Sequence, residues 1–450
     1  MEEKKYNIAI IGGGILGVSI GYFLAFNSQA NTIIIEQEKD VGYHTSSRNT
    51  GKVHSPFLYD PQKKKIFGKI AYLGYEMWEK YSHSKNIYFK NDGVIEIAKE
   101  DKDIDTLRKY LEWGIKNGLD EKDISFLDFN QTQKIEPNVK CRASIYCKRD
   151  ASVDYSLLTK YLKEDYLFSG GNILFSHKVK RIKSGGQNTI IIRSDKGKEE
   201  TIQTDYIINA AGGNSLEIAH SFGIGKDFIN LYFRGEYWIS PKEYESLTCR
   251  SIYTVPRQKK FPFLDPHWIV RIDGHCEVGP NALPVCGAYA YNIRNNFRGV
   301  FPRIQEVVRK KGFWSLVMDK EFLSLILTET NSSISKKAMI NRVKQFLPLI
   351  DPKKFNRRGI SGIRSVLINN QGSFIPDTLL LKDVSSLHIL NYNSPGATGA
   401  LPMAAMIVRD LAKEGIILKN KTNEIPQTKT LQGVPEPLWN IEDIYSRIRS

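Results

Sequence analysis

Three glycines near the N-terminus have the spacing of a turn that binds a dinucleotide. Gly12, Gly14 and Gly17 follow the apolar segment 8–11 and open a helical pattern. In such a turn the first glycine permits a tight bend, the second lets the backbone approach a pyrophosphate, and the third lets the helix pack on the sheet. Glu36 ends a second apolar segment about twenty residues on, where a carboxylate binds ribose hydroxyls. The sequence therefore predicts a strand–turn–helix–strand unit that holds a dinucleotide.

Two later glycine turns also follow apolar strands. Residues 206–209 run into the turn 210–213, and residues 387–391 lead to the turn Ser394–Gly399. A helical pattern over Leu401–Lys413 follows the last turn, so free backbone N–H groups at its start would face a ligand. We therefore expect the dinucleotide-binding domain to resume in both places.

The remaining patterns predict an α/β fold of mixed α+β character. The opening unit belongs to a parallel sheet, whereas alternating segments between Leu231 and Gly279 predict an antiparallel sheet. The polar loop Val41–Asp60 is long for a compact domain, and such loops usually carry function. Further strands are expected at 88–90, 94–98, 172–175, 179–183, 189–193, 232–239, 251–255, 268–272 and 276–279, and helices at 63–81, 103–117, 155–168 and 303–347.

The composition is that of an ordinary folded protein. Hydrophobic residues make up 41% and charged residues 25% of the 450 residues, which excludes a disordered chain. No apolar run reaches the roughly 20 residues that span a bilayer, and the first strand begins too close to Met1 for a signal peptide. The five cysteines lack CxxC spacing, which argues against a disulfide framework and a zinc site. We expect no metal and a cytoplasmic location.

The net charge of +15 is compatible with nucleic acid, acidic substrates or anionic lipid as partners. Basic clusters occur at 63–65, 309–311 with Arg303, 336–337 and 353–358, so they are spread along the chain. This spread predicts a solvated basic surface and makes nucleic-acid binding the weaker alternative. Peripheral contact with the inner face of a membrane stays open as an alternative.

The order of the three glycine turns carries a family resemblance. From about residue 6 to about residue 413, the chain resembles FAD-dependent oxidoreductases of the D-amino-acid oxidase type. Its middle segments resemble L-2-hydroxyglutarate dehydrogenases and oxidases more closely. These segments are Phe233-Arg-Gly-Glu-Tyr237, Ile252-Tyr-Thr-Val-Pro256, Phe261-Pro-Phe-Leu264 with His267, and Val278-Gly-Pro-Asn-Ala282, together with His44, Asn49, Gly51, His54, Gly362-Ile-Arg364 and His388.

The resemblance implies a Rossmann-like FAD-binding domain with an inserted antiparallel-sheet substrate domain. The expected cofactor domain comprises 1–90, 145–230 and 360–415, the substrate domain 91–144 and 231–359, and a peripheral tail 420–450. FAD is the implied cofactor, held by the glycine turns and the long loop. The implied cofactor-binding residues are Gly12, Gly14, Ile15, Gly17, Glu36, Thr45, Ser46, Arg48, Asn49, Val179, Ala211, Gly212, Arg364, Gly396, Ala397, Thr398 and Gly399.

The same resemblance implies catalytic roles for four residues. Arg364 and Tyr253 stand where relatives clamp an α-carboxylate, because a guanidinium meets both oxygens and a phenol adds a donor. His54 and His267 are candidate bases for a hydroxyl proton, since histidine titrates near neutral pH. The structural alternatives are an ion pair for Arg364, a core aromatic for Tyr253 and a core histidine at either position. A third alternative for His54 is a covalent bond to the flavin.

The implied activity is oxidation of a small 2-hydroxy acid to the 2-oxo acid by hydride transfer to flavin N5. L-2-hydroxyglutarate is the leading substrate from the resemblance. The alternatives are oxidation of an amino acid, an amine or glycerol 3-phosphate, and a basic RNA-binding flavoprotein. The electron acceptor stays open between oxygen, a quinone and an electron-transfer protein.

Several residues depart from the family pattern near the substrate. Lys52 replaces an aliphatic residue, Pro56 stands two residues after His54 in place of a small residue, and Cys286-Gly-Ala-Tyr289 replaces a Phe-Lys-Arg-Glu run. Val366 replaces a glutamine, and the arginine of the strand with His267 is shifted to Arg271. Loss of two basic residues and an amide removes partners for a second carboxylate, so the individual substrate stays open.

Overall fold

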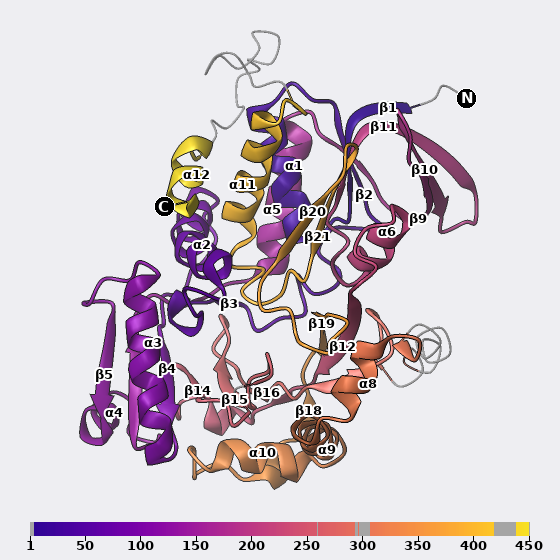
Figure 1. The fold of residues 1–450 in the computed structure, drawn as a ribbon. Coiled ribbons are helices and arrows are strands. Elements are labelled where there is room, and N and C mark those ends of the chain that lie inside the picture. The colour runs from indigo at the N-terminus through magenta and orange to yellow at the C-terminus, as the bar shows by residue number, and fades with distance from the viewer. Residues whose placement is uncertain (1–3, 259, 293–295, 297–306, 418–437, 450) are drawn as a thin grey trace.

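The computed structural model, which describes residues 4–258, 260–292, 296, 307–417 and 438–449, is built on two eight-stranded sheets and a three-stranded sheet (Figure 1). The first sheet has the order β20-β21-β11-β1-β2-β8, with β10 and β9 attached through β11, and its strands from β21 to β8 are parallel. Its strands are β1 (Lys4–Ile11), β2 (Thr32–Ile35), β8 (Asn172–Leu174), β9 (His177–Lys183), β10 (Asn188–Ser194), β11 (Glu199–Asn209), β20 (Leu379–Lys382) and β21 (Ser386–Leu390).

Strand β1 is buried on both of its faces. Ile8 and Ile10 pack into a core formed with four helices, whereas Ala9 and Ile11 pack with isoleucines of β10 and β11 on the other face. An unbroken apolar run is what a parallel strand covered on both faces requires. The four helices are α1 (Ile15–Asn27), α2 (Lys65–Ser84), α5 (Tyr155–Phe168) and α11 (Ala400–Lys413).

The second sheet has the order β18-β13-β16-β15-β14-β4-β6-β5. The predicted antiparallel pairing is right except between β14 and β4, which run parallel. Helix α3 (Ile104–Lys116) covers one face and α10 (Lys336–Lys344) the other. The strands are β4 (Val94–Ala98), β5 (Ile124–Asp128), β6 (Ala143–Cys147), β13 (Trp238–Ile239), β14 (Ser251–Thr254), β15 (His267–Val270), β16 (Cys276–Gly279) and β18 (Arg357–Arg358).

The third sheet is antiparallel and has the order β17-β12-β19. It comprises β12 (Ile229–Gly235), β17 (Leu283–Val285) and β19 (Gly362–Ile368), and its register sets Phe233 opposite Arg364. Helices α8 (Lys311–Val317) and α9 (Lys320–Ile334) pack against it through a core rich in phenylalanine. This sheet brings β19 beside the loop that follows β2.

The mixed α/β fold was predicted correctly, and most helices lie within a few residues of their expected ends. The predicted helix 155–168 is α5 without change. The predicted helix 303–347 is divided, because Asp319 and Ser335 accept hydrogen bonds from backbone N–H groups and begin new helices. Residues 303–306 lie outside the described residues.

Other expectations for the fold were wrong. Tyr88–Lys90 forms no strand beyond one bridge from Lys90 to Ser152, and the segment 232–239 divides between two sheets at Glu236. Helix α12 (Ile441–Arg449) packs on α2 and α11 where only a peripheral tail was expected, while 418–437 lie outside the described residues. The prediction also missed α4 (Phe129–Ile135), β3 (Lys52–Val53) and β7 (Ala151–Ser152). The second glycine turn is followed by helix α6 (Ser215–Ser221).

Candidate active site

A cavity of about 410 Å³ lies at the carboxyl ends of the parallel strands. Its walls combine the ends of β1, β2, β11 and β21 with the loop after β2 and with residues of the other two sheets. Open α/β sheets bind ligands at such strand ends. Every candidate site residue named from the sequence lines this cavity except Gly17 and Gly399.

Gly17 and Gly399 serve helix packing instead. A side chain at Gly17 would place its Cβ 2.0 Å from the carbonyl oxygen of Gly12, so α1 approaches the turn as the sequence predicted. At Gly399, a Cβ would lie 2.4 Å from the side chain of Ile70, where α11 meets α2. Both glycines fix a helix whose N-terminus faces the cavity.

The first turn and Glu36 form a compact group at one end of the cavity. Gly12 has φ 110°, and a Cβ there would lie 2.6 Å from the carbonyl oxygen of Ala210. Glu36 accepts hydrogen bonds from the backbone N–H groups of Gly13 (2.6 Å) and Glu38 (2.9 Å), and burial raises the pKa of its carboxyl. The carboxylate therefore also fixes the turn itself.

The loop after β2 is held largely by its own side chains. Ser46 Oγ accepts from the backbone N–H of Ile15 at 2.9 Å, and Asn49 Nδ2 donates to the carbonyl of Ser46 at 2.8 Å. Thr398 Oγ1 accepts from the backbone N–H of His54 at 3.0 Å. The C-terminal turn therefore positions the loop that carries His54.

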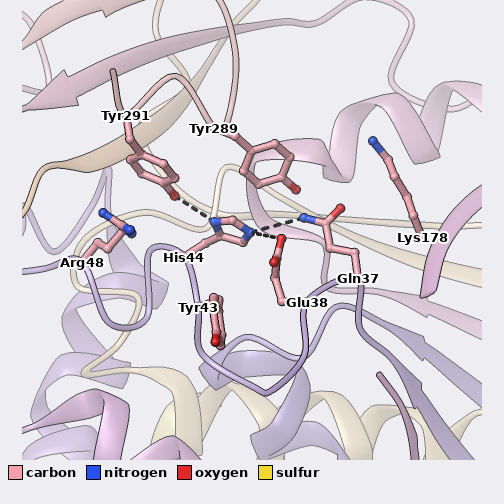
Figure 2. Close-up of a pocket in the computed structure, with 8 residues that line it drawn as sticks. All are labelled: Gln37, Glu38, Tyr43, His44, Arg48, Lys178, Tyr289 and Tyr291. Atoms are coloured by element: carbon pink, nitrogen blue, oxygen red, sulfur yellow. Dashed lines mark hydrogen bonds and ion pairs between the residues drawn. The ribbon is translucent and has the colours of Figure 1, made fainter. Parts of the chain in front are cut away.

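A second cavity of about 430 Å³ adjoins this loop and shares several lining residues with the first (Figure 2). His44 lies at its centre, with Nδ1 3.0 Å from the hydroxyl of Tyr291 and Nε2 3.0 Å from Glu38 Oε1. The rings of His44 and Tyr289 are 4.4 Å apart, and the guanidinium of Arg48 lies 4.2 Å from the ring centroid of Tyr291. Tyr289 and Tyr291 therefore contact His44 and Arg48 of this loop.

Arg364 is a half-buried cation that lines the main cavity. Its Nη1 donates to the carbonyl of Pro262 at 2.6 Å, and no acidic side chain pairs with it in the described part of the chain. Desolvation lowers the pKa of Arg364 below its ordinary value, although its partial exposure is toward the cavity that it lines. The surface ion pair considered from the sequence is therefore absent among the described residues, and the site has room for an anion.

Tyr253 and His267 lie together beside this cation. Their ring centroids are 4.1 Å apart, and the buried hydroxyl of Tyr253 has no hydrogen-bond partner among the residues described. His267 Nδ1 lies 3.0 Å from the carbonyl oxygen of Asp265, so this nitrogen carries the proton and Nε2 is left as an acceptor. Burial lowers the pKa of His267 to about 3, which keeps the ring neutral.

His54 and His388 occupy different environments. His54 lines the cavity, its ring lies 6.2 Å from that of Tyr253, and its Nδ1 is 3.8 Å from Asp150 Oδ2. His388 lies between the side chains of Asn209 (3.0 Å) and Ser386 (2.9 Å), and burial lowers its pKa to about 4. His388 is therefore held by side chains and is part of the core.

The comparison with known families decides what the cavity holds. Residues 7–410 match the family described as FAD dependent oxidoreductase. The chain belongs to this family. FAD is therefore its cofactor, and the glycine turn at the N-terminus is the expected place for the dinucleotide.

Individual relatives of this flavoprotein were also found by sequence similarity. It is 29% identical over 411 residues to the L-2-hydroxyglutarate dehydrogenase of Indibacter alkaliphilus, covering 89% of this chain and 98% of the relative. It is 27% identical to the mitochondrial L-2-hydroxyglutarate dehydrogenase of Homo sapiens, and the match covers 91% of this chain and 89% of that relative.

Solved structures with the same fold include two oxidases. L-alpha-glycerophosphate oxidase from Mycoplasma pneumoniae with FAD bound has a TM-score of 0.70 at 19% identity, covering 90% of this chain and 94% of that one. Glycine oxidase from Geobacillus kaustophilus has a TM-score of 0.65 at 14% identity, with 91% and 95% covered. The similarity to these two solved structures shows that the chain shares their fold.

The residues around the cavity fit FAD. A Cβ at Gly12 would meet backbone, so only glycine leaves the turn open, and α1 begins there without an acidic first turn that would repel phosphates. We expect Gly12, Gly14, Ile15 and Glu36 to hold the nucleotide, and Gly396–Thr398 to contact the other end. Within the described residues, no group of His, Cys, Asp and Glu side chains could hold a metal ion, and no helix has the length and apolar character to span a membrane.

Sequence reasoning missed several cavity residues. Tyr237 lines the main cavity but was left out of the catalytic set, and Tyr289 was noted only as part of a departure from the family. Glu96 does not line the cavity but pairs in register with Tyr253 across β4 and β14, and neither of its buried carboxyl oxygens has a partner among the described residues. Burial raises the pKa of Glu96 to about 8. Tyr237 lies within the predicted strand 232–239 and Tyr289 lies ten residues after the predicted strand 276–279, so only their aromatic residue type was available as an indication.

Proposed function

We propose that the protein oxidises a small 2-hydroxy acid to the 2-oxo acid, with L-2-hydroxyglutarate as its substrate. The observation that carries the proposal is the half-buried Arg364, which lacks an acidic partner in the described chain and stands beside a neutral His267 with a free acceptor nitrogen. A cation for the carboxylate and an acceptor for the hydroxyl proton are what this reaction needs. The names of the relatives support the choice of substrate.

The residues divide the work as follows. FAD supplies the hydride acceptor when it is bound in the cavity. Arg364 binds the substrate carboxylate, and the hydroxyl of Tyr253 donates a further hydrogen bond to it. His267 Nε2 accepts the proton of the substrate hydroxyl as the substrate C–H bond breaks, because the hydroxyl then becomes acidic enough for a base whose pKa is about 3. The bond from Nδ1–H to the carbonyl of Asp265 fixes the required tautomer. His54, whose ring lies 6.2 Å from that of Tyr253, orients the substrate.

A second carboxylate needs a second cation, and Lys64 is the candidate. Lys64 is not among the residues that line the main cavity, but burial and the positive charge of Arg364 both lower the pKa of its amine, while Asp377 and Asp60 act in the opposite direction. Val366 is buried in the core of the third sheet and offers no polar contact. We propose that Lys64 compensates for the basic residues that the family pattern has and this chain lacks.

The electron acceptor is proposed only as a class: oxygen, a quinone or an electron-transfer protein. The cytoplasmic location expected from the sequence is likewise a proposal, with contact at the inner face of a membrane as its finer form.

The test is anaerobic mixing of the holoenzyme with a panel of substrates while the flavin absorbance is recorded. The panel contains L-2-hydroxyglutarate, other 2-hydroxy acids, amino acids and glycerol 3-phosphate. We expect bleaching by 2-hydroxy acids, fastest with L-2-hydroxyglutarate. Bleaching only by an amino acid or by glycerol 3-phosphate would overturn the proposal.

A further inference from the structure

The short antiparallel strands β3 and β7 carry polar side chains on one buried face. Their register places Lys52 opposite Ser152. Two residues further along, the same register sets His54 opposite Asp150, and residues two apart in a strand share a face. The side chain of Lys52 is fully buried, that of Asp150 is 2% exposed, and that of His54 is 16% exposed. One face of this pair of strands therefore buries both cationic and acidic groups beside the main cavity, which His54 lines.

The charges on this face balance only when His54 is protonated. Lys52 Nζ lies 3.1 Å from Asp92 Oδ2, so these two charges neutralise each other. Asp150 Oδ2 accepts from the backbone N–H of Ser55 at 3.2 Å, and its Oδ1 has no hydrogen-bond partner among the described residues. Within the same part of the chain, the side chain that can supply a positive charge to Asp150 is His54, with Nδ1 3.8 Å from Oδ2. A buried carboxylate without a cation is costly, so Asp150 favours an imidazolium at His54.

The other titratable groups near His54 carry no charge at neutral pH. Burial raises the pKa of Cys147, which contacts Ser55, to about 12. Burial and then the negative charge of Asp150 raise the pKa of Tyr253, whose ring lies 6.2 Å from that of His54. Burial lowers the pKa of His267 to about 3, and the nearby His54 adds to this effect. Asp150 is therefore the charged group that acts on His54 at the substrate end of the cavity.

This arrangement provides a place for the proton that the substrate loses. His267 accepts that proton during the oxidation but cannot keep it, because burial favours its neutral ring. We propose that Asp150 is a positioning residue that holds Nδ1–H of His54 toward itself, so that His54 Nε2 receives the proton and keeps it until the product leaves. The inference rests on the proposed function, because that oxidation releases the proton.

The transfer is a plain exchange of one proton between two imidazole rings. The N–H bond at His267 Nε2 breaks, an N–H bond forms at His54 Nε2, and each nitrogen keeps its own electron pair. The resulting imidazolium faces the carboxylate of Asp150, which stabilises it as a buried carboxylate does in an Asp–His pair. Asp150 thus acts through His54 and does not itself line the cavity.

Counting protons during a single anaerobic reduction of the FAD-loaded protein tests the proposal. The protein is mixed in weak buffer at neutral pH with the 2-hydroxy acid that bleaches its flavin fastest, and an indicator dye reports the protons released per flavin reduced. Asp150→Asn removes the charge but can still accept the hydrogen bond from Ser55, whereas Asp150→Glu keeps the charge. The matched control is Asp165→Asn, because Asp165 is a buried carboxylate that pairs with Lys85. Flavin content and the half-saturation value are measured on the same samples.

We expect Asp150→Asn to release more protons per flavin than the wild type, by about half a proton to one proton. Its flavin should be reduced about tenfold or more slowly at saturating substrate, with the half-saturation value unchanged within about twofold. Asp150→Glu should recover most of both properties, and Asp165→Asn should match the wild type.

Equal proton release by the wild type and Asp150→Asn would overturn the inference. Loss of flavin from both Asp150 variants would also overturn it, because the residue would then serve the fold. A wild-type flavin that no 2-hydroxy acid bleaches would instead overturn the proposed function, and this inference with it.

Discussion

The ring of Tyr253 stacks on the ring of His267, with centroids 4.1 Å apart and an angle of 28° between the planes. The pairing of β14 with β15 creates this contact, since Ile252 is in register with Trp268. The buried hydroxyl of one residue and the acceptor nitrogen of the other thereby share one end of the cavity. A substrate held there meets a hydrogen-bond donor and a proton acceptor together.

Replacing His267 by Gln should lower kcat by about a hundredfold to ten-thousandfold, because the proton acceptor is lost. FAD content should stay normal, since His267 lies at the substrate end. Substrate-dependent flavin reduction and the flavin-to-protein absorbance ratio measure the two effects. His275→Gln, at a partly exposed position, is the control and should keep wild-type kcat. A normal rate in His267→Gln would remove this residue from the reaction.

Replacing Arg364 by Lys should weaken substrate binding by about tenfold to a hundredfold, because lysine keeps the charge but loses the bidentate contact. Half-saturation in stopped-flow flavin reduction gives the affinity, and flavin content of the same sample reports on the fold. The exposed Arg357→Lys serves as control. An unchanged half-saturation value with normal flavin would show that Arg364 does not bind the substrate.

Replacing Lys64 by Gln should raise the KM for L-2-hydroxyglutarate about tenfold and leave the KM for a monocarboxylic 2-hydroxy acid within about twofold. The reason is that an ion pair with the second carboxylate is lost only for the dicarboxylate. The neighbouring exposed Lys63→Gln should change neither value. Equal increases for both substrates would contradict a role for Lys64 in selectivity.

Glu96 should make the folded protein less stable as the pH rises from about 4.5 to about 8. Its pKa is raised from 4.5 to about 8 by burial, so the folded state binds a proton that the unfolded state has released in this window. Glu96→Gln should therefore increase the free energy of unfolding at pH 8 by about 2–4 kcal/mol and change it little at pH 4.5. Urea unfolding at both pH values measures the difference, with the exposed Glu100→Gln as control. A variant that is destabilised at both pH values would refute this account.

His267 should have the opposite effect at acid pH. Its folded pKa of about 3 lies below the ordinary 6.5, so the unfolded state binds more protons between these values. Stability should therefore fall as the pH drops from about 6.5 toward 3, and His267→Gln should reduce that slope. The pH dependence of urea unfolding checks the sign, and an unchanged slope in the variant would contradict it.

The sequence predicted the parts of the site that depend on local pattern. Gly12, Gly14 and Glu36 belong to one strand–turn–helix–strand unit, so their positions follow from neighbouring residues. The contact between His44 and Tyr291 joins residues 247 positions apart, so no local sequence pattern could predict it. Likewise, Ile444 and Ile448 of α12 are buried by α2 and α11, although the polar composition around them predicted a peripheral tail.

The orientation of His267 illustrates the same limit. Its residue type indicated a candidate base, but its tautomer depends on the carbonyl of Asp265, and its low pKa depends on burial by distant strands. The parallel pairing of β4 with β14, which sets Glu96 beside Tyr253, joins segments far apart in the chain. The tautomer and pKa of His267 and the position of Glu96 therefore depend on how distant strands pair and on which groups they bury, and a local sequence pattern contains neither.

The most direct test of the central claim compares the two enantiomers of 2-hydroxyglutarate in a single anaerobic turnover of the holoenzyme. We predict that the L-enantiomer bleaches the flavin and yields one 2-oxoglutarate per flavin reduced, while the D-enantiomer leaves the flavin oxidised. Flavin absorbance and the quenched product are measured on the same sample. A flavin that stays oxidised with L-2-hydroxyglutarate at every concentration, in protein with full FAD content, would contradict the account.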